Sequence, residues 1–432
     1  MWRRWVSPSR VASLKGLSTD AVFTTASQIV ATLAAIALQV LLARNVELSV
    51  FGRISAAQAL VLLVEGALVS RGSETALQVM GARWKDGPST LKSVARHLLG
   101  QDILITCAGF AIFAAAGALV APLFGADRWM VVVMACSIPL QINYGLRKNL
   151  FLLQNRIRKQ SYFEIGYSAS MIIVGCILIP WFGAWGFVAT LLAGAAIKNL
   201  LVHRMTREYW APIQQAPDAP LPADVVRTTR ISGLHSVLRN LLSNGATNID
   251  VLILGLTGRP EVVGLYRVAR TLANSPVKIA APLWLVLRPR LLSAYRSDDH
   301  GRFCKIIGLA AAAFGIGSAL VAATVWLIGG PLLEHLYGPA YAGALNPLLI
   351  LIIGSSIFGA VTGWLSFAMV ISSRKSLGTA LFALQLGLIA IGGMLLAGGT
   401  AVGMAAAVAG CNLIVSAVAW WALLAGRFRH VT

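Results

Sequence analysis

The stretch DAVFTTASQIVATLAAIALQVLLA (20–43) decides the class of fold to which this chain belongs. Its only charged residue is Asp20, and it exceeds the roughly 20 apolar residues that an α-helix needs to cross a bilayer. Its polar residues recur at helical spacing, so that Thr24 and Gln28 fall on the same face. The stretch therefore predicts a membrane-spanning helix that carries one polar stripe.

The composition of the whole chain agrees with this interpretation. Of its 432 residues, 57% are apolar and only 12% are charged, whereas soluble domains average about 25% charged residues. This balance excludes a soluble enzyme, a disordered protein and a nucleic-acid-binding domain. The 5 cysteines are scattered, without a CxxC motif or a Cys/His cluster, so we expect neither a disulfide framework nor a metal site.

Similar apolar stretches recur to the end of the chain, and they predict an all-α polytopic membrane protein. We expect twelve spans, at 20–43, 51–70, 98–121, 129–151, 162–182, 185–203, 232–256, 262–287, 304–333, 344–371, 377–397 and 400–424. The proline-rich segment APIQQAPDAPLPAD (211–224) lies near the midpoint, and prolines at this density do not favour a continuous helix. The sequence thus predicts an N-terminal six-helix lobe over 1–203, a cytoplasmic linker over 204–231 and a C-terminal six-helix lobe over 232–432.

Two short matches relate the predicted lobes. Val50-Phe51-Gly52 corresponds to Val262-Val263-Gly264, and Leu123-Phe124-Gly125 corresponds to Leu336-Tyr337-Gly338, at nearly the same offset. Six spans in each half give both halves the same direction of insertion. The matches therefore predict a parallel repeat about the membrane normal, an arrangement known from transporters.

The basic residues predict how the chain crosses the membrane. Most of the 36 lysines and arginines fall in the connections on one side, while the opposite connections hold Arg44, Arg53, Arg128 and Arg259. Because cytoplasmic loops are enriched in basic residues, both termini are expected in the cytoplasm. The formal net charge of +20 is then explained by these topology signals, and nucleic acid is not an expected partner.

Polar stripes run along four predicted spans, the first, second, seventh and eighth. In the eighth span, Arg267, Arg270, Asn274 and Lys278 lie within an arc of about 100° at 100° per residue. Charged residues inside a membrane usually face a bundle interior or a water-filled cavity. The four stripes predict a central cavity with excess positive charge, which would stabilise an anion. The candidate substrate-binding residues are Arg239, Arg267, Arg270, Asn274, Lys278, Asn240, Asn244, Gln28 and Thr24, and the candidate ion-coupling residues are Glu65 and Asp250.

The same residues are also compatible with structural roles. Arg267 and Arg270 are also compatible with snorkelling to the membrane surface, and Lys278 with a pair to Glu65. Asp250 is also compatible with a pair to Arg44 or Arg53, and the asparagines with contacts between helices.

Three segments resemble a known family. LQVLLARNVELSVFGRISAAQAL (38–60), VVGLYRVARTLANSPVKIAAPLWLVLRPRLLSAY (262–295) and LLEHLYGPAYAGALNPLLIL (332–351) are similar to the polysaccharide (O-antigen, Wzx-type) flippases. These belong to the multidrug/oligosaccharidyl-lipid/polysaccharide exporter superfamily. The resemblance implies that the protein is not an enzyme and that it translocates an undecaprenyl-pyrophosphate-linked oligosaccharide across the bacterial inner membrane by alternating access.

The resemblance also implies partners and leaves alternatives. The partners would be the lipid-linked oligosaccharide, membrane lipid, and the polysaccharide polymerase with its chain-length machinery. No cofactor is implied, and the coupling ion stays open between H+ and Na+. A multidrug/cation antiporter of the same superfamily and a lipid II flippase are the alternatives. An antiporter is expected to have more carboxylates than cations in its cavity, and the predicted stripes have fewer.

Overall fold

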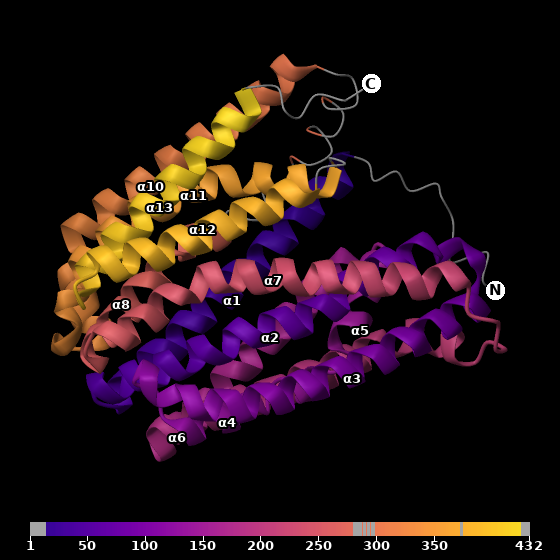
Figure 1. Ribbon diagram of the computed structural model, residues 1–432, viewed down its shortest axis with the longest axis horizontal. Helices are drawn as coiled ribbons and strands as arrows, with labels where there is room; N and C mark the ends of the chain where they lie inside the picture. Colours follow the sequence, from indigo (N-terminus) through magenta and orange to yellow (C-terminus); the bar gives the residue numbers. More distant parts are fainter. Residues whose placement is uncertain are drawn as a thin grey trace. The chain divides into compact units, whose positions relative to one another are not determined.

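The computed structural model describes residues 14–279, Leu287, Leu291, Ala294, 299–371 and 375–424. Every regular element in these residues is helical (Figure 1). Both termini, which the charge pattern predicts to be cytoplasmic, lie outside the described residues. The α-helices are α1 (Leu14–Asn45), α2 (Leu48–Ala82), α3 (Pro88–Val120), α4 (Arg128–Ala135), α5 (Tyr144–Leu153), α6 (Ile157–Gln214), α7 (Ala223–Thr257), α8 (Pro260–Ala273), α10 (His300–Tyr337), α11 (Leu345–Ile371), α12 (Lys375–Leu396) and α13 (Ala401–Leu424). Short 3₁₀ turns are η2 (Trp84–Asp86), η3 (Ala121–Phe124), η4 (Pro139–Gln141) and η5 (Pro339–Ala344).

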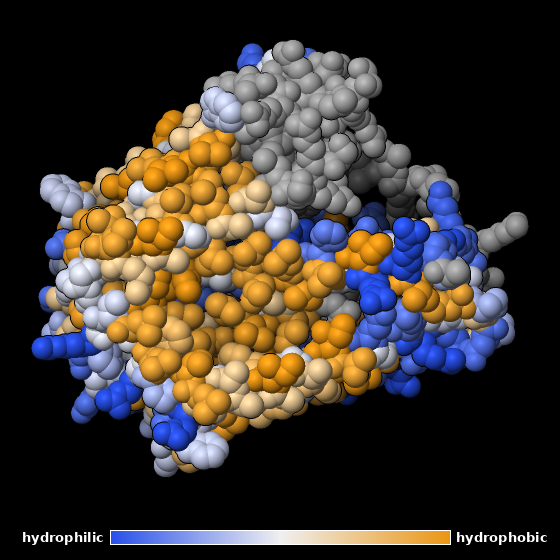
Figure 2. All heavy atoms as spheres, in the orientation of Figure 1, coloured by the Kyte–Doolittle hydropathy of each residue, from blue (hydrophilic) through white to orange (hydrophobic). Residues whose placement is uncertain are grey.

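The described helices confirm an all-α, multi-pass membrane protein. By length and hydropathy, 8 of them can cross a membrane, or up to 9 if the bent pair Arg128–Gln141 and Tyr144–Leu153 is one span. α7 and α8 are not among these helices, because polar side chains lower the hydropathy of α7 and because α8 is short. Large apolar side chains such as Leu119 and Trp181 are 80% and 82% exposed. Similar apolar side chains cover much of the face drawn in Figure 2, as expected for a surface in contact with lipid.

Two predicted spans are interrupted in the structure. The predicted span 129–151 bends by 44° between η4 and α5, where Asn143 adopts a left-handed conformation with φ 70°. The predicted span 262–287 begins as α8, which ends at Ala273, and a turn at Asn274 follows. Residues 280–286 and 288–290 of that region lie outside the described residues. Helical structure resumes over residues 275–279. The polar and proline-containing sequences at both interruptions explain why neither helix is continuous there.

The predicted boundary between the fifth and sixth spans coincides with a glycine turn. Gly183 has φ 54° and ψ −122°, a conformation that only glycine adopts readily, and it divides α6 into two helical arms. The arms then pack closely, because a Cβ on Gly186 would lie 2.1 Å from the carbonyl oxygen of Leu178.

The linker is shorter than predicted. The sequence predicts a non-helical segment over 204–231, but α6 continues through Pro212 to Gln214 and α7 begins at Ala223. One proline removes a single backbone hydrogen bond, whereas the closely spaced Pro217, Pro220 and Pro222 end helical structure. The short segment is held to the start of α3, where Lys92 Nζ lies 2.8 Å from Asp218 Oδ1 and donates to the carbonyl oxygen of Ala216 at 2.8 Å.

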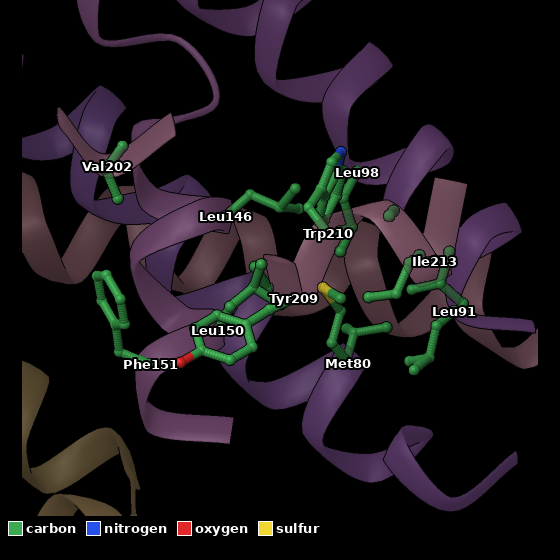
Figure 3. Packing of buried hydrophobic residues seen from close by; sticks show 14 of the residues in the cluster. Met80, Leu91, Leu98, Leu146, Leu150, Phe151, Val202, Tyr209, Trp210 and Ile213 are labelled. Carbon is green, nitrogen blue, oxygen red and sulfur yellow. The ribbon is translucent and has the colours of Figure 1, made fainter. Parts of the chain in front are cut away.

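The chain forms two compact units. Unit 1 comprises Met1–Ala34, Leu60–Pro122 and Asp127–Asn244, and unit 2 comprises Ala35–Ala59, Leu123–Ala126 and Gly245–Thr432. Unit 1 is built on buried side chains of α2, α3, α5 and α6, among them Met80, Leu98, Phe151 and Trp210 (Figure 3). In unit 2, α11 packs against α10, α12 and α13. The two units are defined by contacts between residues and not by the sequence repeat. The division into repeat-related lobes at 1–203 and 232–432 therefore stays a prediction.

Two glycines that the sequence repeat aligns lie against each other in unit 2. A Cβ on Gly52 would lie 1.8 Å from the carbonyl oxygen of Pro260 and 3.2 Å from the amide nitrogen of Gly264. Conversely, a Cβ on Gly264 would lie 3.0 Å from the carbonyl oxygen of Leu48. The N-terminal turns of α2 and α8 therefore meet backbone to backbone, a distance that only glycine permits.

Candidate functional site

A buried ion pair forms the centre of the basic cluster in unit 2. Arg270 of α8 places Nε 3.0 Å from Oδ2 of Asp250, which lies on α7. The hydroxyl of Tyr266 donates to the same oxygen at 2.6 Å, and the amide of Val251 donates to Asp250 Oδ1 at 2.9 Å. Asp250 and Tyr266 are 0% exposed. Arg270 is thus neutralised within the protein, and its charge is not free for a ligand.

Arg267, one turn earlier on α8, is bound differently. Its Nη2 donates to the side-chain oxygen of Gln58 on α2 at 3.1 Å, and its buried Nε has no hydrogen-bond partner among the described residues. Within the described part of unit 2, no carboxylate lies at ion-pair distance from Arg267. A guanidinium that has only a neutral partner keeps its full charge for an anion.

Lys278 and Asn274 continue the stripe beyond the end of α8. Lys278 is exposed, and Arg267 and Arg270 are the charged groups that act on it electrostatically. Asn274 stands at the turn, where its side-chain oxygen accepts a hydrogen bond from the hydroxyl of Ser355 at 3.2 Å. In the structure, Arg267 and Arg270 act electrostatically on Lys278, and among the described residues Asp250 is the carboxylate that pairs within this cluster.

The other candidate substrate residues lie in unit 1. Thr24 donates to the carbonyl oxygen of Asp20 in its own helix at 2.8 Å, and Gln28 is half-buried on the same helix. Arg239 pairs with Glu74 across α7 and α2. Asn240 is 8% exposed, and its Nδ2 has no hydrogen-bond partner in the described residues. Asn244 packs on Gly66, where an added Cβ would lie 2.3 Å from Nδ2. Asn244 thus packs in the contact between α2 and α7.

Glu65 belongs to a second polar network, which also lies in unit 1. The side-chain amide of Gln141 donates to Glu65 Oε1 at 2.5 Å, and the hydroxyl of Ser137 lies 3.3 Å from Oε2. Lys198 donates to the side-chain oxygen of Gln141 at 3.1 Å and lies 4.3 Å from the ring centre of Tyr144. The network joins α2, the bent α4–α5 region and α6.

A further ion pair extends this network. Lys148 Nζ lies 2.6 Å from Glu164 Oε1 and 5.7 Å from the ring centre of Tyr144. The network therefore contains two carboxylates and two ammonium groups, so that its formal charges balance.

Sequence reasoning missed several members of these two clusters. Tyr266 was counted among the apolar residues, although a tyrosine inside a span needs a hydrogen-bond partner. Ser137 and Gln141 are polar residues inside a predicted span and were detectable by that signal. Lys148 and Lys198 lie inside the predicted spans 129–151 and 185–203 but were grouped with the basic residues of the cytoplasmic connections. Glu164, inside the predicted span 162–182, was not singled out.

Comparisons with known proteins agree with the architecture. The model of the family described as "Polysaccharide biosynthesis protein" matches residues 17–295. No curated protein matches this chain. Among solved structures, an inward-facing multidrug resistance MATE family transporter of the MOP superfamily has a TM-score of 0.70 at 13% identity, covering 94% of this chain and 99% of that one.

Two further solved structures have the same fold. A mutant of the MATE transporter VcmN from Vibrio cholerae has a TM-score of 0.64 at 16% identity, covering 96% of this chain and 98% of its own. The eukaryotic MATE transporter AtDTX14 has a TM-score of 0.63 at 15% identity, covering 95% of each chain. At these identities the likeness shows the fold, while the family is shown by the sequence match. The chain is thus a multi-pass membrane protein of the polysaccharide biosynthesis protein family and has the fold of the MATE transporters.

Proposed function

We propose that this protein is a flippase that carries an undecaprenyl-pyrophosphate-linked oligosaccharide from the inner to the outer leaflet of the bacterial inner membrane. The family match and the exporter fold support transport of a saccharide, and the distribution of basic residues supports cytoplasmic termini. The protein then acts by alternating access and not as an enzyme. Its substrate combines a pyrophosphate with a long apolar chain, so its passage requires a cationic site within the membrane.

One observation carries this proposal, the unpaired charge of Arg267. Of the two arginines on α8, Arg270 is neutralised by Asp250, whereas Arg267 has only the neutral Gln58. Lys278 is exposed near both of them. A guanidinium can bind two oxygens of a phosphate at once, and an ammonium adds a point charge. Arg267 and Lys278 therefore recognise the pyrophosphate, while Arg270 and Asp250 hold α8 to α7.

The coupling site of this proposal is Glu65, with H+ or Na+ as the coupling ion. Glu65 is a carboxylate on a membrane-spanning helix, and ionisable residues in such positions often belong to ion pathways. Its hydrogen bonds from Ser137 and Gln141 join three helices of unit 1. A change in its charge would therefore alter contacts among these helices.

The test is glycan display in bacterial cells that lack their own flippase, with the abundance of each variant measured in the membrane. We expect Arg267→Ala with Lys278→Ala to abolish display at normal abundance. Arg267→Lys should also reduce display strongly, because an ammonium cannot replace the guanidinium fork. Arg259→Gln is the matched control, since Arg259 is an exposed arginine immediately before α8. Full display by the double variant would contradict the proposal.

A second assay separates coupling from recognition. Glu65→Gln should keep substrate binding but make transport independent of the proton or sodium gradient. Transport that keeps its dependence on the gradient would exclude Glu65 as the coupling residue. Export of cationic drugs by the same cells, without glycan display, would favour the antiporter alternative.

A further inference from the structure

Unit 1 contains a buried guanidinium that has no carboxylate partner among the described residues. Arg147 on α5 is 4% exposed, and its Cζ lies 5.0 Å from the ring centre of Trp210 on α6. Its Nε makes no hydrogen bond, and no carboxylate of the described residues pairs with it. The indole nitrogen of Trp210, a residue that is 6% exposed, also has no acceptor. Two donors of this small region, Arg147 Nε and the indole N–H of Trp210, therefore have no acceptor among the described residues.

Two other cations of unit 1 have carboxylate partners. Arg158 stacks on Phe23 at 5.6 Å, much as Arg147 stacks on Trp210, but Arg158 also has Asp20 at 2.9 Å. Lys148, the neighbour of Arg147 in sequence, has Glu164 at 2.6 Å. Removing a charge from water without a partner is costly, so buried charges are normally paired. The exception at Arg147 indicates that its counter-ion is not part of the chain.

The open side of this region is basic. His203, Arg207 and Trp210 lie on one face of α6, at spacings of four and three residues. His203 and Arg207 are exposed, and both Arg147 and Arg207 act on His203 electrostatically. An anion that approaches from the surface would therefore meet exposed cationic groups first and Arg147 behind them.

We propose that Arg147, Trp210, His203 and Arg207 form a site for the phosphate group of a membrane lipid. The arginine fork matches phosphate oxygens, and the indole N–H adds a neutral donor. Basic pockets between membrane helices on the cytoplasmic side are known to hold anionic head groups, and the basic-residue pattern predicts that side for these residues. The phosphate belongs either to an anionic phospholipid or to a polyprenyl pyrophosphate. The site shares no residue with the proposed pyrophosphate site of Arg267 and Lys278, and it does not depend on the proposed flippase activity.

The experiment uses the full-length protein purified in detergent, with three lipids titrated separately. These are phosphatidylglycerol, phosphatidylcholine with the same acyl chains, and a short-chain polyprenyl pyrophosphate, with bound lipid counted by native mass spectrometry. The variants are Arg147→Gln, Arg147→Lys and the matched control Arg158→Gln, which removes an aromatic-stacked arginine that has a carboxylate partner. Thermal unfolding of each variant without lipid checks that it folds. Arg147→Gln should fold well, because it removes an uncompensated buried charge.

We expect wild type and Arg158→Gln to bind one of the two anionic lipids at least about tenfold more tightly than phosphatidylcholine, and Arg147→Gln to lose this preference. Arg147→Lys should retain part of it, since the charge remains while the fork is lost. Preference for phosphatidylglycerol identifies a resident phospholipid, and preference for the pyrophosphate identifies the polyprenyl carrier. Equal binding of all three lipids, or an unchanged preference in Arg147→Gln, would overturn the proposal. A variant that loses this preference but still displays glycan would separate the lipid site from the flippase activity.

Discussion

In unit 1, Glu65 and Glu164 accompany Lys148 and Lys198, whereas in unit 2 a single carboxylate, Asp250, accompanies three cations. Both clusters lie on helices of a membrane protein, where every unbalanced charge raises the cost of insertion. The balanced network of unit 1 is explained by contacts between its helices and by the coupling role proposed for Glu65. The excess charge of unit 2 has no balancing carboxylate among the described residues and is therefore the stronger indication of a ligand.

The largest effect should follow from breaking the buried pair of unit 2. Asp250→Asn leaves Arg270 as an uncompensated charge in a fully buried position, so we expect the free energy of unfolding to fall by about 3–5 kcal/mol. Thermal or denaturant unfolding of the purified protein measures this change. The double variant Asp250→Asn with Arg270→Met should recover most of the loss, because it removes the stranded charge. Equal stability of the single variant and wild type would show that the pair is not a structural element.

A smaller effect is expected from the corresponding change in unit 1. The side chains of Lys148 and Glu164 are 27% and 17% exposed, so water can compensate partly when one partner is lost. Glu164→Gln should lower the free energy of unfolding by about 1–2 kcal/mol, less than the change at Asp250. The same unfolding assay compares the two variants directly. A loss as large as that of Asp250→Asn would remove the distinction drawn between the clusters.

Neutralising the unpaired cation of unit 2 should hardly change stability. Arg267→Met removes one hydrogen bond to Gln58 but also the desolvation cost of a charge without a carboxylate. We expect the free energy of unfolding to change by less than about 1 kcal/mol, or to rise. Glycan display measured alongside should nevertheless be lost. Strong destabilisation would instead assign Arg267 to the structural framework, together with Arg270.

The smallest effect is expected outside the membrane, where Asp218 holds the linker to α3. Lys92 and Arg96 lie 2.8 Å and 3.2 Å from this carboxylate, and their hydrogen bonds keep the pKa of Asp218 below its usual range. A lowered pKa means that the contact is complete above the ordinary carboxyl value of about 3.9. It is then lost as the pH falls through the lower pKa of the folded state.

Hydrogen exchange of the linker amides, corrected for intrinsic rates, measures this contact. Wild-type protection should fall only below about pH 4, while Asp218→Asn should show the reduced protection at every pH. A wild-type profile that does not change with pH would exclude this ion pair as the linker contact. Because Asp218 and Arg96 are exposed and Lys92 is only half-buried, overall stability should hardly change.

Much of the architecture could be predicted from hydropathy. The spans expected over 304–333, 344–371, 377–397 and 400–424 correspond to α10–α13, because long apolar runs have few alternatives to membrane helices. Interruptions were harder to predict. The left-handed turn at Asn143 and the end of α8 at Ala273 depend on packing and on local hydrogen bonds. The continuation of α6 through Pro212 shows that one proline does not by itself end a helix.

For the candidate site, helical periodicity in the sequence predicted that Arg267, Arg270 and Lys278 share one face. The structure keeps the two arginines on α8, whereas Lys278 follows the turn at Asn274. The sequence also predicted that Gly52 and Gly264 hold corresponding places in a repeat. Only the tertiary structure decided that Asp250 and Tyr266 bind Arg270, that Arg267 receives a neutral amide, and that the two glycines meet. Local sequence rules do not distinguish two arginines that lie one helical turn apart. Their difference arises from side chains on α7 and α2, which are distant in sequence and are brought to α8 by folding.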